Sequence, residues 1–326
     1  MSLDVGGGTS TPTSRMEMLE QLARLFSLVG NTRLHCADLG SLELCVKLEF
    51  ANPTGSHKDR IALYMLKGAI EEGLVSPGDC VAEISSGNTA AAVAWAASFL
   101  GLRPLLFVER RASRIKKSLI VSLGGEIIEI GDEGLTRDWA REEAERRGCI
   151  LLDQMDNDYN MLAHYETTGL ELVRQSGGRL DAFVMGVGTG GTITGVGRRL
   201  KEMIGSTLVA AVTPRGSPLA GGEGLDEIEG LMSRSIPGLL KRHGSGVVDI
   251  VVDIGLEEAL WGVRQLLQRV GVAAGPSSGA AYVAALRLVD EGRLERGSRV
   301  AILAADSLAR YPWVMERLAS TQRGSG

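Results

Sequence analysis

The sequence offers little that would suggest a metalloprotein, a membrane protein or a nucleic-acid-binding protein. Its four histidines are widely scattered, so a histidine-rich metal site is not expected. No apolar run approaches the roughly 18 residues that would suggest a membrane span. The net charge of −5 gives no reason to expect nucleic acid or an anionic membrane surface as a partner.

Cysteine is also scarce. Cys36, Cys45, Cys80 and Cys149 contain no CxxC pair, and the composition is not that of a disulfide-stapled scaffold. We therefore expect reduced thiols in a cytoplasmic protein. Residues 1–15 lack a basic start followed by an apolar stretch, so we expect a flexible leader and no secretion signal.

The sequence does contain a regular alternation of short apolar runs and longer amphipathic stretches. A length of 326 residues suggests two domains. Repeated strand–helix alternation predicts an α/β fold with parallel sheets covered on both faces and right-handed crossovers. The expected strands are 43–49, 80–85, 103–108, 126–130, 149–152, 182–187, 207–212, 247–252 and 299–303; the expected helices are 59–73, 89–100, 113–123, 135–147, 167–175, 192–203, 256–270 and 280–291.

The segment 213–230 is rich in glycine, proline and serine and long for a loop in a compact domain. Two interpretations remain open: a loop that closes over a substrate, or a mobile surface segment.

The first segment with chemical potential is NPTGSHKDR, in which Lys58 stands between an expected strand and an expected helix. Asn52, Pro53 and Gly55 predict a tight turn before it. A lysine at a helix start lies near positive partial charge, which favours the free amine that Schiff-base chemistry needs. Taken alone, a solvated surface lysine is the more common outcome.

The second segment is SSGNT, residues 85–89, directly after a strand and before a helix. Two hydroxyls, an amide and backbone N–H groups at a helix N-terminus form a natural receptor for a small carboxylate. Ordinary helix capping by serine and asparagine is the alternative.

The third segment is GVGTGGTITGVG, residues 186–197, between a strand and a helix. Its glycines let the backbone wrap closely around an anion, and Thr189 and Thr192 add hydroxyl donors. The GxGxxG spacing also raises a dinucleotide site, but the following strand ends in Thr213 and Pro214 and lacks the acidic residue that such a site expects. A single phosphate is the favoured ligand.

The fourth segment is GPSSGA, residues 275–280, at the start of another helix. The hydroxyl of Ser277 could face a ring nitrogen and would suit an unprotonated pyridine. A capping serine pair is the alternative.

Together and in this order, these segments resemble those of the fold type II pyridoxal-phosphate enzymes, in the cysteine synthase and cystathionine β-synthase branch. The resemblance runs from about Leu25 to Tyr311. It implies two doubly wound domains with parallel-rich sheets, with 40–156 as an N-terminal substrate-carboxylate domain and 16–39 with 157–326 as a C-terminal cofactor-phosphate domain.

The resemblance also implies roles for individual residues. Lys58 would carry pyridoxal 5′-phosphate, and Ser277 would face its pyridine nitrogen. Asn88 would reach the cofactor's ring oxygen, and the segment HYETTG, residues 164–169, would be mainly structural. The implied phosphate loop comprises Gly188, Thr189, Gly190, Gly191 and Thr192, and the implied carboxylate-binding residues are Ser85, Ser86, Asn88, Thr89 and Gln154.

The sequence departs from the family pattern in three places. Ser85 stands where threonine is frequent and Ala90 where glycine is frequent, and both changes are small. In the segment 226–237, a stretch that is glycine-rich in acetylserine-using relatives instead contains Arg234. That position resembles the arginine of phosphoserine-using relatives, with Arg215 as a second candidate. Both could equally be exposed surface arginines.

The implied activity is that of a cysteine synthase, which replaces the leaving group of O-acetylserine or O-phosphoserine with sulfide. The alternatives are a cystathionine β-synthase that uses homocysteine, a serine or threonine dehydratase, and a binding or scaffold protein that has kept the fold. A homodimer is expected from the resemblance alone.

Overall fold

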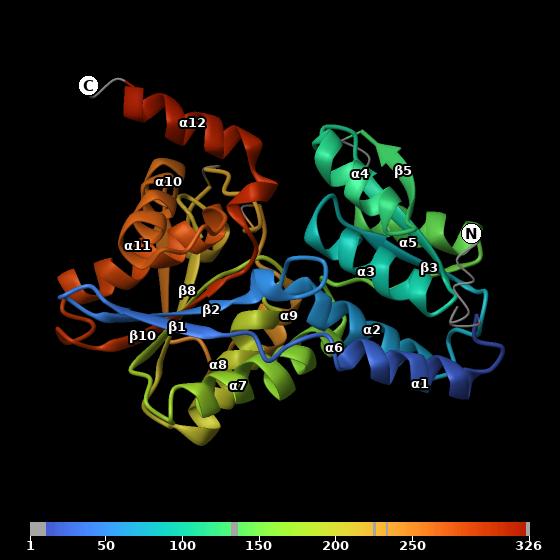
Figure 1. Ribbon diagram of the computed structural model, residues 1–326, viewed down its shortest axis with the longest axis horizontal. Coiled ribbons are helices and arrows are strands. Elements are labelled where there is room, and N and C mark those ends of the chain that lie inside the picture. Colours follow the sequence, from blue (N-terminus) through green and yellow to red (C-terminus); the bar gives the residue numbers. More distant parts are fainter. Residues whose placement is uncertain (1–10, 132–135, 224–225, 233, 324–326) are drawn as a thin grey trace, which may run out of the picture. The chain divides into compact units, whose positions relative to one another are not determined.

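A computed structural model describes residues 11–131, 136–223, 226–232 and 234–323 (Figure 1). The chain forms two compact units. The first is built from residues up to Leu28 and from Met65–Asp153, and the second from Val29–Tyr64 and from Gln154 onward. Most of the expected leader, residues 1–15, lies outside the described residues.

The boundaries differ from the expected ones in three places, of which the smallest is residues 154–156, which belong to the second unit. Residues 40–64 belong to the second unit, because β2 (Glu43–Leu48) pairs in parallel with β10 (Arg299–Ala304). Helix α1 (Arg15–Phe26) belongs to the first unit. There the Ser14 side chain caps the helix and the Arg15 guanidinium donates to the Glu71 carbonyl.

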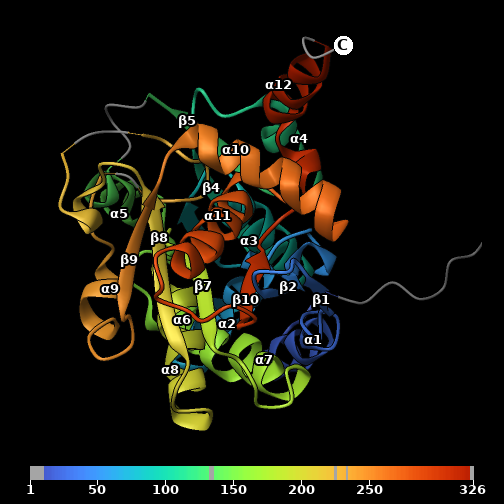
Figure 2. The same ribbon diagram turned by 90° about the vertical axis from the view of Figure 1, so that its left-hand side faces the viewer.

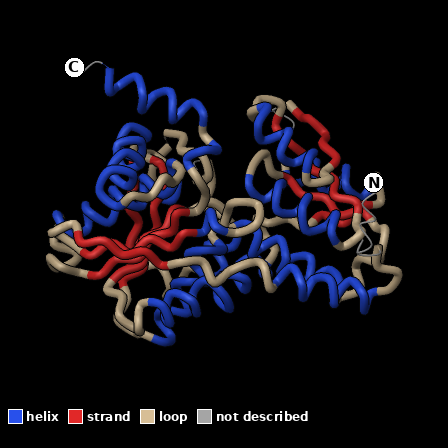
Figure 3. The backbone as a smooth tube through the Cα atoms, in the orientation of Figure 1, coloured by secondary structure: helices blue, strands red, loops and turns tan. Residues whose placement is uncertain are grey.

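The first unit contains a sheet of four parallel strands in the order β5-β4-β3-β6. Strands are drawn in red in Figure 3. Phe107 packs on α5 through Ala140 and Ala144. The preceding residue, Leu106, faces α3 and α4 near Ala94 and Ile120, as the alternation of side chains along a strand requires. The elements are β3 (Cys80–Ile84), β4 (Arg103–Glu109), β5 (Glu126–Ile130), β6 (Cys149–Leu151), α3 (Asn88–Phe99), α4 (Arg114–Ser122) and α5 (Arg137–Arg146).

The second unit contains a sheet of six strands in the order β1-β2-β10-β7-β8-β9 (Figure 2). Only the β1–β2 pair is antiparallel. Helices α10 and α11 cover one face and α7 and α8 the other (Figure 1). The further elements are β1 (Leu34–Asp38), β7 (Ala182–Gly186), β8 (Leu208–Pro214), β9 (Ile250–Ile254), α6 (Asp158–Ala163), α7 (Gly169–Gln175), α8 (Gly191–Met203), α9 (Gly238–His243), α10 (Leu256–Gln265), α11 (Pro276–Asp290) and α12 (Pro312–Arg323).

The expected α/β fold with parallel-rich sheets is confirmed. All the expected strands and helices are present, and β9 begins three residues later than predicted. Strand β1 was not predicted, because its five residues are only half-buried and carry no clear apolar alternation. No helix within the described ranges is long and apolar enough to cross a membrane.

The expectation of reduced thiols is wrong for this structure, which contains the disulfides Cys36–Cys45 and Cys80–Cys149. Cys36 and Cys45 are direct partners across β1 and β2, and Cys80 and Cys149 across β3 and β6. The Cα atoms of the pairs lie 4.0 and 4.4 Å apart. Strand pairing brings these cysteines together, and their sequence spacing contains no sign of it.

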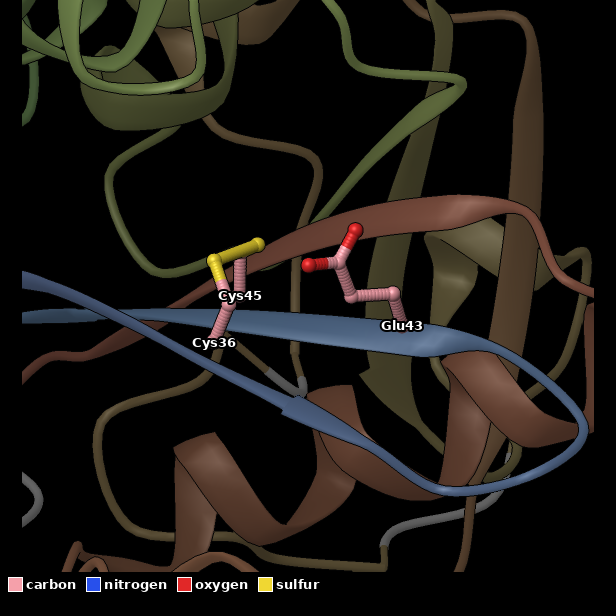
Figure 4. A group of neighbouring side chains, drawn as sticks. All are labelled: Cys36, Glu43 and Cys45. Atoms are coloured by element: carbon pink, nitrogen blue, oxygen red, sulfur yellow. A yellow bond between two sulfur atoms is a disulfide. The ribbon is translucent and has the colours of Figure 1, made fainter.

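Glu43 lies beside the first disulfide (Figure 4). Within the part of the chain that the structure describes, only one group of three or more His, Cys, Asp or Glu side chains is close enough together to hold a metal ion. It consists of Cys36, Glu43 and Cys45. However, the sulfur atoms are bonded to each other, and the Glu43 carboxylate pairs with Arg299 at 3.0 Å. In this state the group has no thiolate to offer an ion.

Candidate active site

Lys58 is the first residue of α2 (Lys58–Glu71). The preceding turn is closed by the Gly55 N–H, which donates to the Asn52 carbonyl at 2.8 Å, and Gly55 has a φ of 85° that favours glycine. The Asp59 carboxylate accepts the Thr54 N–H at 2.7 Å and also the Thr54 hydroxyl. The turn therefore holds Lys58 at a defined position at the helix start, as the sequence predicts.

Gln154 lies next to Lys58. The Lys58 Nζ donates to the Gln154 Oε1 at 3.4 Å. Gln154 follows β6 and Asp153, which has a positive φ of 52°. The Gln154 carbonyl in turn accepts the Nδ2 of Asn160 at 2.8 Å, which anchors its backbone to α6. Residues 96 positions apart in the sequence thus meet in the second unit.

The loop between β7 and α8 has no room for side chains at its glycines. A Cβ on Gly188 would lie 2.7 Å from the Gly230 carbonyl oxygen, and a Cβ on Gly191 would collide with the Asn160 amide. Gly190 has a φ of 89° and precedes the first residue of α8, whose start has no side-chain cap. The loop therefore brings bare backbone to an uncapped helix N-terminus, where an anion is favoured.

Thr189 and Thr192 are both nearly buried, at 6% exposure each. Thr189 Oγ1 accepts the Asn160 Nδ2 at 2.9 Å and the Gly191 N–H at 3.4 Å. Thr192 Oγ1 lies 3.1 Å from the Nε2 of His164. The protein thus fixes both hydroxyl groups in place at the loop.

Ser277 lies in the first turn of α11, after Gly275 and Pro276. Ser278 has a structural role, because its Oγ accepts the Ala305 N–H at 3.2 Å. Among the described residues, the Ser277 hydroxyl has no hydrogen-bond partner, although the residue is only 8% exposed. Ser277 is therefore the member of the pair that could contact a ligand.

These segments are linked by contacts within the second unit. Gln154 connects Lys58 to Asn160, and Asn160 connects to Thr189. On the other side, Gly230 approaches both Gly188 and Ser277: a Cβ on Gly230 would lie 3.8 Å from the Ser277 Oγ. The lysine, the glycine loop and the serine thus belong to one cluster.

Residues 85–89 belong to the first unit, between β3 and α3. The Ser85 Oγ accepts the Gly87 N–H at 3.3 Å, and the Ser86 Oγ accepts the Glu109 N–H at 2.8 Å. Helix α3 begins at Asn88 after Gly87, without a side-chain cap. The serines are thus not the caps of α3, and a role of this loop beside Lys58 stays a prediction.

The two arginines considered for a phosphoryl leaving group each have an acidic partner. Arg234 pairs with Glu227 at 2.9 Å, with side-chain exposures of 63% and 51%. Arg215 pairs with Glu258 and is also exposed. In this conformation both are surface ion pairs, which contribute little energy.

Buried charges lie close to Lys58. Arg60 makes a paired contact with Glu49, at 2.7 and 2.8 Å, and a second one with Glu171, at 2.6 and 2.9 Å. Burial alone would raise the pKa of Glu49, but the Arg60 guanidinium lowers it below its usual range. Lys47 pairs with Glu171 at 2.6 Å and balances the cluster. This network holds the first turn of α2 against η1 (Glu49–Ala51) and α7.

Two buried histidines lie beside the lysine and the glycine loop. The rings of His57 and His164 are 5.7 Å apart. Burial, and then the charge of Lys58, lowers the pKa of His57 to about 3. Burial, and then His57, lowers the pKa of His164 well below its usual value. Both imidazoles are therefore neutral at neutral pH.

A lysine at a helix start that lies in one cluster with a glycine–threonine anion loop is the arrangement expected of an enzyme that attaches a small phosphorylated cofactor. The family model described as pyridoxal-phosphate dependent enzyme matches residues 25–306. The chain belongs to the family of pyridoxal-phosphate-dependent enzymes.

Two curated relatives and one solved structure show the closeness of the match. The chain is 36% identical over 294 residues to a cysteine synthase of Staphylococcus aureus (strain Mu50 / ATCC 700699), which covers 87% of this chain and 93% of that protein. It is 36% identical over 285 residues to a cystathionine beta-synthase of Apis mellifera, covering 82% of this chain but only 55% of that protein's length. The crystal structure of an O-ureido-L-serine synthase has a TM-score of 0.83 at 31% identity, covering 90% and 94% of the two chains.

The residues of the cluster fit pyridoxal phosphate. The glycines leave a cradle that a Cβ would fill at Gly188 and Gly191. Thr189 and Thr192 supply hydroxyls at an uncapped helix start, and the Ser277 hydroxyl has no partner among the residues that the structure describes. This donor set suits a phosphate at one end and an uncharged ring nitrogen at the other.

Asn160 was not among the expected site residues, and the resemblance implied a mainly structural role for His164. No local pattern marks Asn160 as important. His164 was part of a recognised segment, but its contact with Thr192 depends on packing between α8 and the π-helix His164–Thr168.

Proposed function

We propose that this enzyme is a cysteine synthase, which replaces the leaving group of an activated serine with sulfide to give L-cysteine. The observation that carries the proposal is the single cluster of Lys58, Gln154, the 188–192 loop and Ser277 in the second unit. The 36% identity to a cysteine synthase over most of both chains supports the same reaction.

In this proposal the bound cofactor supplies an electron sink for the substrate. Lys58 would hold the cofactor covalently, and its Nζ, once freed, would take the proton from the substrate Cα. Gly188, Gly190 and Gly191 present bare backbone, and the neighbouring threonine hydroxyls would bind the phosphate. The Ser277 hydroxyl would contact the ring nitrogen without adding a negative charge, which suits elimination at the β-carbon.

The substrate carboxylate would be bound by the segment 85–89 together with Gln154. The Ser85 and Ser86 oxygens already accept backbone N–H groups. Their own O–H groups are therefore available as donors, as a carboxylate requires. Asn88 and Thr89 lie in the first turn of α3, whose positive end favours an anion. Asn88 would also reach the ring oxygen of the cofactor.

The leaving group is either acetyl or phosphoryl. A phosphoryl group carries about two negative charges at neutral pH and would gain from a guanidinium. Arg234 could supply one only by leaving Glu227. The surface ion pair therefore favours O-acetylserine in the conformation seen here, and phosphoserine use requires movement of this segment.

The test is an assay of purified enzyme with sulfide and either O-acetylserine or O-phosphoserine, each at matched concentrations. The proposal expects cysteine from at least one substrate, and a visible cofactor band that hydroxylamine removes. Serine with homocysteine tests for a cystathionine β-synthase, and pyruvate release from serine or threonine tests for a dehydratase. The proposal would be rejected if the enzyme were active only in the homocysteine assay or only in the pyruvate-release assay. It would also be rejected if the protein took up no cofactor.

We also propose that the enzyme is a homodimer and that it works in the cytoplasm, as the family resemblance implies. Sedimentation of the purified enzyme tests the dimer. The disulfides Cys36–Cys45 and Cys80–Cys149 make the location testable, because most cytoplasmic proteins keep their thiols reduced. Thiol trapping in intact cells should find these cysteines free if a reducing cytoplasm is the site of action.

A further inference from the structure

Asn160 and His164 contact the two threonines of the glycine loop from neighbouring turns of one helical segment. They are four residues apart, which places them on the same helix face. We propose that they are positioning residues, which hold the hydroxyls of Thr189 and Thr192 as donors toward the cofactor phosphate. The inference rests on the proposed assignment of the 188–192 loop to that phosphate.

The orientation of the Asn160 amide is determined by its partners. Its Nδ2 lies 2.8 Å from the Gln154 carbonyl oxygen, which can only accept. The same Nδ2 lies 2.9 Å from the Thr189 Oγ1, so its two hydrogens serve two acceptors. The flipped orientation would place the Asn160 Oδ1 against a carbonyl and is excluded.

Thr189 is consequently restricted to donation. A hydroxyl has two acceptor positions and one proton. The Asn160 Nδ2 and the Gly191 N–H occupy the acceptor side of its Oγ1. The Thr189 O–H can therefore only donate a hydrogen bond. In the proposed function, a phosphate oxygen at the loop is its acceptor.

A buried asparagine in this position is energetically costly. Asn160 is 0% exposed, and its Oδ1 has no hydrogen-bond partner within the described residues. A buried acceptor without a hydrogen-bond partner destabilises the folded protein. The Oδ1 packs directly against Gly191, which has no side chain to displace it. In return, the Asn160 amide donates two hydrogen bonds, one to the Gln154 carbonyl and one to the Thr189 Oγ1.

His164 can do the same for Thr192. Burial, and then the neighbouring His57, lowers the pKa of His164 well below its usual value, so the ring has one N–H and one lone pair. Its Nδ1 lies 3.0 Å from Thr168 Oγ1, and its Nε2 lies 3.1 Å from Thr192 Oγ1. Either hydroxyl could donate or accept, so these contacts alone allow both tautomers.

A bound phosphate selects one of them. Phosphate oxygens accept, so the Thr192 O–H turns to the phosphate, and its oxygen must then receive the hydrogen from Nε2. Nδ1 is left to accept from Thr168. His164 should therefore carry its hydrogen on Nε2 in the loaded enzyme.

The first measurement is the dissociation constant of the cofactor-free enzyme for pyridoxal phosphate and for pyridoxal, which lacks the phosphate. Thr189→Val and Thr192→Val test the loop itself. Asn160→Leu and His164→Asn remove the positioning contacts, while His164→Gln keeps an amide N–H near the position of Nε2. Thr207→Val is the matched control, because it removes a buried hydroxyl that donates to the Leu180 carbonyl at 2.9 Å, away from the loop.

We expect Asn160→Leu and His164→Asn each to weaken pyridoxal phosphate binding about tenfold, as expected for a lost hydrogen bond to a charged site, with little change for pyridoxal. His164→Gln and Thr207→Val should stay within about threefold of wild type by the same reasoning. The positioning role would be refuted if Asn160→Leu and His164→Asn weakened the binding of pyridoxal phosphate and of pyridoxal equally. It would also be refuted if these two variants left pyridoxal phosphate binding unchanged while the threonine variants weakened it. If the threonine variants themselves fail to distinguish the two ligands, it is the phosphate-loop assignment that fails.

The second measurement needs no variant that could misfold. Nitrogen-15 NMR of the labelled wild-type enzyme should show His164 protonated on Nε2 once pyridoxal phosphate is bound. A ring protonated on Nδ1 in the loaded enzyme would contradict the proposal.

Discussion

The side-chain oxygen of Gln154 lies 3.4 Å from the Nζ of Lys58, within hydrogen-bonding distance. An uncharged amide next to this lysine can orient the amine without adding a negative charge that would keep it protonated. A group that binds substrate at this position would also be adjacent to the nitrogen that receives the α-proton.

Lys58→Ala should bind pyridoxal phosphate without a covalent link and lose β-replacement by several orders of magnitude. The variant removes both the attachment point and the proton acceptor. The measurement is the visible spectrum together with turnover. Near-wild-type turnover would reject the assignment of Lys58.

Arg234→Ala tests the leaving group. If Arg234 reads a phosphoryl group that is desolvated on binding, its loss should cost about 2–4 kcal/mol in the specificity constant for O-phosphoserine and leave O-acetylserine nearly unchanged. Glu227→Gln is the matched variant, because it frees Arg234 from its partner and should favour phosphoserine. Equal effects on both substrates, or no phosphoserine turnover, would leave Arg234 as a surface residue.

Stability should fall as the pH drops from about 6.5 to about 5. Burial, and then the charge of Lys58, lowers the pKa of His57 from 6.5 to about 3, and burial, then His57, lowers that of His164 as well. The unfolded chain therefore takes up protons that the folded chain does not. Asp59 acts in the opposite direction, because burial raises its pKa from 3.8 to about 6.

Toward the acidic end of this pH window, the unfolded chain binds about two more protons than the folded chain at the two histidines, and about one fewer at Asp59. The net slope should be about 1.4 kcal/mol per pH unit. Urea unfolding at pH 5, 5.5, 6 and 6.5 measures it. Asp59→Asn should make the slope steeper, and a flat profile in the wild type would contradict the neutral, buried state of the histidines.

The two disulfides should differ in their effect on stability. Cys80–Cys149 spans 69 residues and Cys36–Cys45 only 9. Because a longer closed loop restricts the unfolded chain more, paired serine variants should lose about 4 and about 3 kcal/mol respectively. Denaturant unfolding of the two double variants gives the comparison. If the two double variants lost equal free energy of unfolding, or if reduction of the wild type lowered it not at all, the disulfides would not act by restricting the unfolded chain.

The sequence by itself determined the local features of this protein. Hydrophobic periodicity placed the helices and most strands, because side-chain periods of 3.6 and 2 follow directly from backbone geometry. Turn residues located Lys58 at the start of α2, and the glycine run located the loop before α8. These signals lie within a few residues of the feature that they predict.

Only the tertiary structure decided which distant side chains meet. The pairing of Cys80 with Cys149 and the placement of β2 beside β10 depend on strand order and on the path of the loops. The contacts of Asn160 with Thr189 and of His164 with Thr192 arise where α6 and the π-helix pack against α8. Such contacts join residues about thirty positions apart in the sequence, and the hydrophobic burial that drives this packing is non-directional, so no local pattern could have named them.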